Sequence, residues 1–314
     1  MRPKRPDPVR KPFCPYGMER IREGYTSLKK EVRGAQAGDD ATHIHRMRVA
    51  SRRLRAALPI FSSCLPKKAY RRWFRAVKTI TRSLGKARDL DVQIAFLKDY
   101  MRNGYPSGCT KPPFQEENPS DSGLSALMRT LTSQRAAVQP EIDAIAGLFS
   151  DTGVFSDLPS AIRTASTVRT SRTNIRERAA RETTRRYAAL IAFDPSARDP
   201  EAVKAHHAMR IAAKKYRYTL EIFDEACDGR YKETIKVVRK LQDILGMMHD
   251  CDVWIETLEG AWLSREGDPG TEPGDPGLIT LLEDRKNERN AQYRKFLLLW
   301  EQFLQQSPLN RGAR

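Results

Sequence analysis

The chain has 314 residues, and 56 lysines and arginines against 39 aspartates and glutamates give it a formal net charge of +17. A chain this basic is attracted to polyanions. No apolar run approaches the roughly 20 residues that a membrane-spanning helix needs, and no apolar stretch follows the basic N-terminus as a secretory signal requires. The odd number and wide spacing of the cysteines fit neither a disulfide framework nor a zinc site: Cys14, Cys64, Cys109, Cys227 and Cys251. We therefore expect a cytoplasmic protein with reduced thiols and no membrane association.

Apolar residues recur with the 3.6-residue period of helices along nearly the whole chain. Proline- and glycine-rich segments at 103–123 and 267–277 interrupt this pattern, and a basic tail through Pro15 precedes it. Asp199 and Pro200 are suited to the N-cap and first turn of a helix, and Pro140 should kink or split one. The helices expected are 16–35, 40–63, 67–102, 124–149, 160–193, 200–227, 230–262 and 278–305. Short connections between such helices favour an all-α fold of antiparallel bundles.

Two segments of the sequence occur twice. HRMRVASRRLRAALPIF (45–61) and HAMRIAAKKYRYTLEIF (207–223) are identical at eight of seventeen positions. LGKARDLDV (84–92) and LGMMHDCDV (245–253) follow at nearly the same offset. The near-constant offset predicts an internal duplication, with two similar halves of about four helices related by a pseudo-twofold axis. The boundaries expected are a basic tail at 1–15, a first half at 16–150, a second half at 151–306 and a C-terminal tail at 307–314.

The first repeat places its basic residues on one face of a helix. His45, Arg48, Arg52 and Arg55 fall within an arc of about 90°, and the opposite arc holds the expected core residues Met47, Ala50, Leu54, Ala57, Leu58 and Phe61. The second copy repeats this basic stripe with His207, Arg210, Lys214 and Arg217. Solvated helix faces usually mix acids with bases, yet residues 41–58 contain no acid. The pattern therefore favours an anion-binding surface over a merely solvated face, with Arg53 and Lys215 as rim contacts or simple surface charges.

The next helix carries a second basic stripe, with Trp73, Val77, Ile80 and Leu84 expected in the core behind it. Its members are Arg71, Arg75, Lys78 and Arg82, and the second half repeats the first three as Lys232, Lys236 and Arg239. The fourth position changes sign and becomes Asp243. Like charges at this spacing destabilise a helix by roughly 0.2–0.5 kcal/mol per pair, a cost that a bound polyanion would offset.

Taken together, the two repeated segments resemble the CHAD domain, the conserved-histidine α-helical domain, over about residues 17–305. The resemblance implies two four-helix bundles with a basic central groove or cavity, binding of inorganic polyphosphate, and association with polyphosphate granules. It carries the family's basic positions onto His45, Arg48, Arg52, Arg53, Arg55, His207, Arg210, Lys214, Lys215 and Arg217. No Glu-x-Glu-x-Lys run of the CYTH domain accompanies them, so a stand-alone CHAD protein is expected. Asp243 and the lysines at 214 and 215 imply that the two halves bind unequally.

Two kinds of residue in the repeats have more than one interpretation. His45 and His207 head their stripes and are expected to contact phosphate, although a structural histidine bonded to a carboxylate is the alternative. Asp89 and Asp250 fall on the basic stripes, whereas Asp91 and Asp252 fall toward the core. Buried carboxylates need partners, so we expect Asp91 and Asp252 to orient a neighbouring arginine or accept helix N–H bonds rather than to act in catalysis.

Other functions are weighed against polyphosphate binding. Nucleic acid is the main alternative partner, but the stripes hold no aromatic residue to stack bases. No glycine-rich phosphate loop, nucleophile elbow or paired-carboxylate motif appears, so we expect no enzyme, catalytic residue or cofactor. His43 with His45, and His206 with His207, diverge too far on a helix to share a metal ion. A metal site built across helices, and a scaffold for an acidic protein, remain as further alternatives.

Overall fold

The computed structural model describes residues 12–38, 40–103, 123–167, 174–263 and 275–305, and every regular element in these ranges is helical. The α-helices are α1 (Phe13–Lys30), α2 (Val32–Ala37), α3 (Ala41–Ile60), α4 (Lys67–Asn103), α5 (Gly123–Asp143), α6 (Leu158–Ser166), α7 (Ile175–Ile191), α8 (Asp194–Ala197), α9 (Val203–Asp224), α10 (Lys232–Leu263) and α11 (Pro276–Gln305). Short 3-10 turns η2 (Ser62–Cys64), η3 (Ala144–Phe149) and η4 (Glu225–Cys227) join some of them. The expected all-α fold is confirmed. No described helix combines the length and apolarity needed to cross a membrane.

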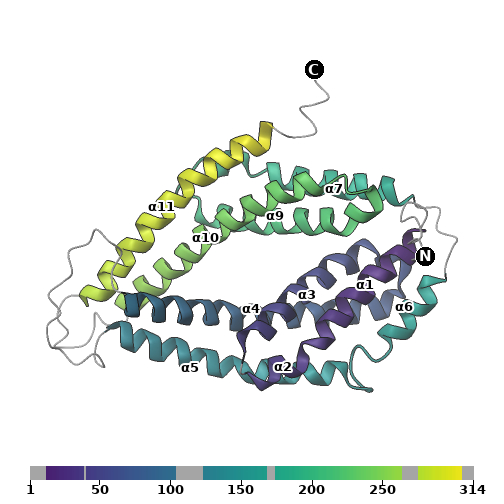
Figure 1. The fold of residues 1–314 in the computed structure, drawn as a ribbon, viewed down its shortest axis with the longest axis horizontal. Coiled ribbons are helices and arrows are strands. Elements are labelled where there is room, and N and C mark those ends of the chain that lie inside the picture. Colours follow the sequence, from purple (N-terminus) through teal and green to yellow (C-terminus); the bar gives the residue numbers. More distant parts are fainter. Residues whose placement is uncertain (1–11, 39, 104–122, 168–173, 264–274, 306–314) are drawn as a thin grey trace, which may run out of the picture. The chain divides into compact units, whose positions relative to one another are not determined.

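Unit 1, Met1–Ile175, is built on the long helices α1, α3, α4 and α5. In Figure 1, α3 lies between α1 and α4, and α4 lies alongside α5. The apolar faces of these helices meet as the periodicity predicts. The side chains expected in the core of α3 and α4 are all buried: Met47, Ala50, Leu54, Ala57, Leu58, Phe61, Trp73, Val77, Ile80 and Leu84. The short helix α6 packs against α1. For that reason unit 1 continues to Ile175 and does not end at residue 150, where the sequence analysis placed the boundary.

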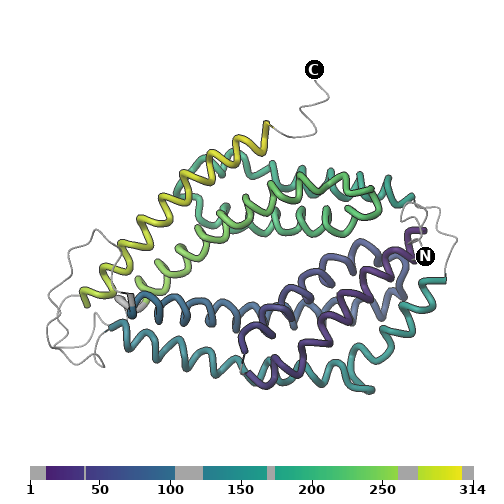
Figure 2. Tube along the Cα trace, viewed as in Figure 1, coloured from purple at the N-terminus to yellow at the C-terminus, as the bar shows by residue number. Residues whose placement is uncertain are grey.

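Unit 2, Arg176–Arg314, has one core shared by α7, α9, α10 and α11. In Figure 2 the chain runs along α9, turns into α10 and returns along α11, which packs against α10. The core side chains include Tyr187, Leu190, Met209, Leu220, Leu241, Phe296 and Trp300. Trp300 also donates its indole N–H to Asp194 at 2.8 Å, which anchors α11 to the short helix α8. Each unit thus holds four long helices, and the duplication remains an interpretation of the sequence.

Helix ends differ from the prediction where local side chains or packing compete with the helix. Asp199 does not cap a helix at Pro200. It accepts the N–H of Glu201 at 2.9 Å in a local turn, and α9 begins only at Val203. Pro140 neither splits nor ends α5, which continues to Asp143 before tightening into the 3-10 turn η3. In contrast, Asp40 caps α3 as a helix start should, because it accepts the N–H of Thr42 at 2.7 Å.

Two of the expected helices and the expected N-terminal tail have different bounds in the structure. The span 16–35 is divided at Glu31 into α1 and α2, and 160–193 contains two helices, α6 and α7. α1 begins at Phe13, inside the expected tail, and Phe13 and Cys14 are already buried. The rest of that tail, the C-terminal tail and most of both proline-rich segments lie outside the described residues.

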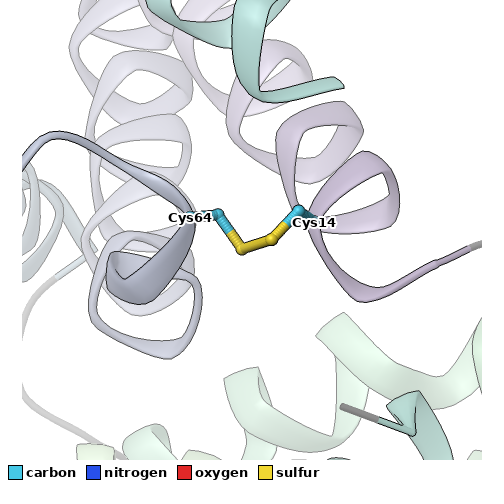
Figure 3. Close-up of a disulfide and its surroundings, with 2 residues drawn as sticks. All are labelled: Cys14 and Cys64. Carbon is cyan, nitrogen blue, oxygen red and sulfur yellow. A yellow bond between two sulfur atoms is a disulfide. The ribbon is translucent and has the colours of Figure 1, made fainter. Parts of the chain in front are cut away.

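Cys14 and Cys64 form a disulfide that joins the first turn of α1 to η2 (Figure 3). The expectation that all thiols are reduced is wrong for this pair, and the argument for a reducing compartment fails with it. The two cysteines are 50 residues apart in sequence. They meet only because α1 packs against α3 and brings its first turn beside the end of that helix. Cys227 and Cys251 are free and buried, and Cys109 lies outside the described residues.

Replacing both disulfide cysteines with serine is expected to lower the free energy of unfolding of unit 1 by about 2–4 kcal/mol, because the cross-link closes a loop of this length in the unfolded chain. Urea denaturation of the full chain without reductant measures the loss. Dithiothreitol should produce a similar loss in the wild-type chain and none in the double variant. Equal stability of the two proteins under oxidising conditions would contradict the prediction.

Candidate anion-binding site

The basic stripe of α3 lies on the solvent side of unit 1. His45, Arg53 and Arg55 are exposed, and Arg48 and Arg52 are partly exposed. The opposite side of the same helix is buried from Ile44 to Phe61. The stripe residues of α4, namely Arg71, Arg75, Lys78 and Arg82, are also exposed, while Trp73, Val77 and Ile80 between them have no exposed surface. The helical period therefore places all of these predicted residues where a soluble anion can reach them.

A contact between α3 and α4 shows that their stripes face the same surface. Arg48 donates to Asp89 at 3.0 Å, and Asp89 lies on the same face of α4 as Arg82, seven residues earlier. The short turn at η2 makes the two helices antiparallel, so a residue further along α3 is level with one earlier on α4. Arg55 is therefore level with Arg82. We call the residues on this face the unit 1 basic surface: His45, Arg48, Arg52, Arg55, Arg71, Arg75, Lys78, Arg82 and Arg88.

Most of the charge on the unit 1 basic surface is uncompensated. Within the described residues, the side chains of seven of its members form no ion pair with an acid: Arg52, Arg55, Arg71, Arg75, Lys78, Arg82 and Arg88. Arg75 donates to the backbone oxygen of Arg71 at 3.3 Å, which leaves its charge unopposed. Arg48 forms an ion pair with the exposed Asp89, and Glu141, which pairs with Lys86, lies near enough to Arg82 to interact with its charge. Clustered cations without counter-charges create a positive potential that attracts polyanions.

His45 lies beside an arginine that the sequence analysis did not single out. Partial desolvation of its ring lowers the pKa of His45, and the positive charges of Arg88 and then Arg48 lower it further. His45 is therefore mainly neutral at pH 7 and has no hydrogen-bond partner in the described part of the chain. The histidine bonded to a carboxylate is His43, whose Nδ1 lies 2.8 Å from Glu31. The structural alternative considered for His45 thus applies to its neighbour.

In unit 2 the corresponding place holds two histidines. Nδ1 of His207 on α9 lies 3.2 Å from Nδ1 of His249 on α10, and the ring centroids are 4.4 Å apart. Burial lowers the pKa of both rings, and Arg210 and Lys214 lower it further. The pKa of His249 falls to about 3. Both rings are therefore neutral at pH 7 and share a hydrogen bond.

Acidic and amide side chains occupy much of the unit 2 stripe. Arg217 donates to Gln242 at 2.8 Å and to Glu221 at 2.7 Å. Glu221 is also 3.8 Å from Arg239, and Lys236 pairs with Glu233 at 2.8 Å. The remaining predicted residues are the exposed Lys215 and Lys232 and the partly exposed Arg210 and Lys214. With Asp243 in the place of Arg82, unit 2 presents less uncompensated positive charge than unit 1.

The second aspartate of each repeated motif forms an ion pair with the following long helix. Asp91 accepts from Nε of Arg135 on α5 at 2.7 Å, and Asp252 accepts from Nε of Arg289 on α11 at 2.8 Å. All four side chains are largely shielded from solvent. This is the structural role expected for Asp91 and Asp252, each bonded to a neighbouring arginine. Each ion pair joins two long helices, α4 to α5 and α10 to α11.

Sequence reasoning missed four residues of these arrangements: Arg88, His249, Arg135 and Arg289. Arg88 and His249 directly precede the first aspartate in LGKARDLDV and LGMMHDCDV, so the repeat contained the information that places them at equivalent positions. The two partner arginines lie on other helices, and no local pattern marks them. Among the described residues, no group of three or more His, Cys, Asp or Glu side chains could hold a metal ion.

Comparison with known proteins identifies relatives of this chain. A family model described as the CHAD domain matches residues 19–259. The crystal structure of the CHAD domain from the plant Ricinus communis is similar at a TM-score of 0.57 and 19% identity, covering 96% of this chain and 90% of that one. PptA from Streptomyces chartreusis is similar at a TM-score of 0.61 and 15% identity, covering 92% and 99%. No curated protein matches the sequence. At these identities the two structures establish the fold alone.

Proposed function

The chain belongs to the CHAD domain family, and from this premise we propose that it binds inorganic polyphosphate on its basic helix faces and catalyses no reaction. The observation that carries the proposal is the unit 1 basic surface, where the exposed arginines and lysines of two adjacent helices form no ion pair with an acid in the described part of the chain. A bound polyanion would offset the repulsion among them. The corresponding surface of unit 2 would add a second, weaker set of contacts.

The chemistry of these residues suits polyphosphate. Arginine offers a planar fork of donors to phosphate oxygens, and lysine offers a compact charge with three donors. Side chains three and four positions apart on a helix are about 5–6 Å from one another, so a flexible chain of phosphates would meet several donors in succession. Proteins that bind single-stranded nucleic acids place aromatic rings among such cations. Here Phe61 and Tyr216 are buried in the core instead.

The proposal also covers the absence of catalysis and the place of the protein in the cell. Binding without chemistry is supported by Asp91 and Asp252, the largely shielded carboxylates of the repeated motifs, each of which is paired with an arginine. A dedicated polyphosphate binder would also accumulate on polyphosphate granules in the cytoplasm. Whether the basic surfaces of both units line one central groove remains a prediction of the family resemblance.

A competition titration tests the proposed function. Labelled long-chain polyphosphate is bound to the full chain at about 150 mM salt, where exposed charges are screened beyond roughly 8 Å. It is then challenged with single-stranded RNA, duplex DNA, tripolyphosphate and orthophosphate, and the release of phosphate is followed in parallel. We expect only long polyphosphate to compete well, with no phosphate released. Equal competition by RNA would replace the proposal with general polyanion binding, and phosphate release would overturn its non-enzymatic part.

A further inference from the structure

We propose that unit 2 binds phosphate chains with uptake of protons at the His207–His249 pair, so that acidification strengthens binding there. The inference rests on the proposed function and assigns a role to His249, a residue outside both basic stripes. Arg88 occupies the equivalent place in unit 1, where its guanidinium supplies a charge that does not titrate. Binding to unit 1 would then depend on permanent charges, and binding to unit 2 would depend partly on protonation of the two rings.

The contact between the two rings explains why an anion would bring protons with it. At 3.2 Å, one Nδ1 carries a hydrogen and donates it to the lone pair of the other Nδ1. Protonating both rings puts two N–H groups face to face, which is unfavourable unless a nearby acceptor takes both hydrogen bonds. A phosphate oxygen beside the pair, off the line that joins the two nitrogens, would accept from both. The anion therefore stabilises the doubly protonated pair, which the free protein disfavours.

Most of the charges around the pair oppose protonation of the rings in the free protein. Arg210 and Lys214, on the same helix as His207, oppose protonation of both rings, and Asp252 on α10 favours it for His207. Asp252 is itself bonded to Arg289 of α11, which lies 3.5 Å from the neighbouring His206. A phosphate chain that pairs with Arg210 and Lys214 offsets the repulsion they exert on the rings. Arg210 and Lys214 thus keep the two rings neutral in the free protein. When they bind a phosphate chain, its negative charge allows the rings to take up protons from solvent.

The direction of the pH effect follows from linkage. The pKa of each ring is low in the free protein and rises in the complex, so the complex holds more protons between the two pKa values. Affinity therefore increases as pH falls through the pKa of the bound state. For each proton taken up, the association constant rises by up to about tenfold per pH unit.

Calorimetry on the full chain tests the proposal with two probes. Long-chain polyphosphate and dextran sulfate, whose sulfates do not titrate, are injected at several pH values between about 5.5 and 8. At each pH, two buffers with different heats of ionisation are used, so that protons taken up are counted directly. Wild-type protein should take up protons with both probes and bind more tightly as pH falls. Tight binding without proton uptake would overturn the inference and leave the proposed function standing.

Matched variants assign the protons to the pair. His249→Arg introduces the guanidinium that Arg88 supplies in unit 1. His249→Gln puts a neutral side chain at the same position and serves as the second variant if the larger arginine disturbs the fold. Both should take up fewer protons and show a flatter dependence of affinity on pH. Arg88→His should steepen it, and His43→Gln, which alters a histidine paired with Glu31, should leave it unchanged. An unaltered proton uptake in both His249 variants would contradict the proposal. Failure of the wild-type chain to bind either probe at any pH would overturn the proposed function and this inference together.

Discussion

Replacing Asp252 with alanine is expected to lower the free energy of unfolding of unit 2 by about 3–5 kcal/mol. Asp252 accepts from Nε of Arg289 at 2.8 Å, and the side chains of the two residues are only 11% and 8% exposed. The change leaves the guanidinium of Arg289 buried without a counter-charge beside the lowered-pKa ring of His206. Leaving a buried charge unpaired lowers the free energy of unfolding by far more than the intact ion pair contributes to it. Urea denaturation of the full chain measures the loss.

A control on the same helix separates this effect from the loss of any carboxylate. Asp243 is exposed on α10, and its replacement by alanine should change the unfolding free energy by no more than about 0.5 kcal/mol. Removing both charges of the buried pair, as Asp252→Leu with Arg289→Met, should restore much of the stability lost in the single variant. Equal unfolding free energies for the Asp252 and Asp243 variants would show that the pair does not hold α10 and α11 together.

Neutralising four residues of the unit 1 basic surface is expected to weaken polyphosphate binding at least about a hundredfold at 150 mM salt. The variant changes Arg52, Arg55, Lys78 and Arg82 to glutamine. Hydrogen bonds to charged groups contribute about 1.5–3 kcal/mol each when shielded, and the exposure of these four residues reduces that value without abolishing it. The slope of log affinity against log salt should also become shallower by about 3, at roughly 0.7 per contact for a single-stranded polyanion. Binding titrations at a series of salt concentrations yield both quantities.

A charge-matched variant provides the comparison. Arg22, Lys29, Lys30 and Arg33 are exposed on α1 and α2 and form no ion pair with any residue in the described ranges. Changing them to glutamine lowers the net charge by the same amount away from the basic surface. This variant should retain most of the affinity and nearly the wild-type salt slope. If both quadruple variants lose affinity equally, net charge and not a defined surface attracts the polyanion.

The faces of α3 and α4 were predictable from sequence because the helical period fixes which side chains point together. Met47 and Leu58 are fully buried, and Arg55 and Arg82 are exposed, as the periodicity indicated. The helical period does not predict the register between neighbouring helices. The pairing of Arg48 with Asp89, and of Arg217 with Gln242, requires knowing which turns of two neighbouring helices are level.

Other features depended on contacts that no local pattern records. Cys14 and Cys64 meet through the packing of α1 beside α3, so their spacing carried no information about the disulfide. Arg135 and Arg289 act as partners of the motif aspartates from helices outside the repeats. At Asp199 the local pattern itself was ambiguous, because the same side chain can cap a helix or close a turn, and here it closes a turn.

The most direct test of the account is a crystal structure of the full chain with a polyphosphate of defined length. The account predicts phosphate oxygens within hydrogen-bonding distance of Arg52, Arg55, Lys78 and Arg82 on α3 and α4, with further contacts at His207 and Arg210 on α9. Electron density for polyphosphate on α1, α2 or α11, with these side chains unengaged, would contradict it.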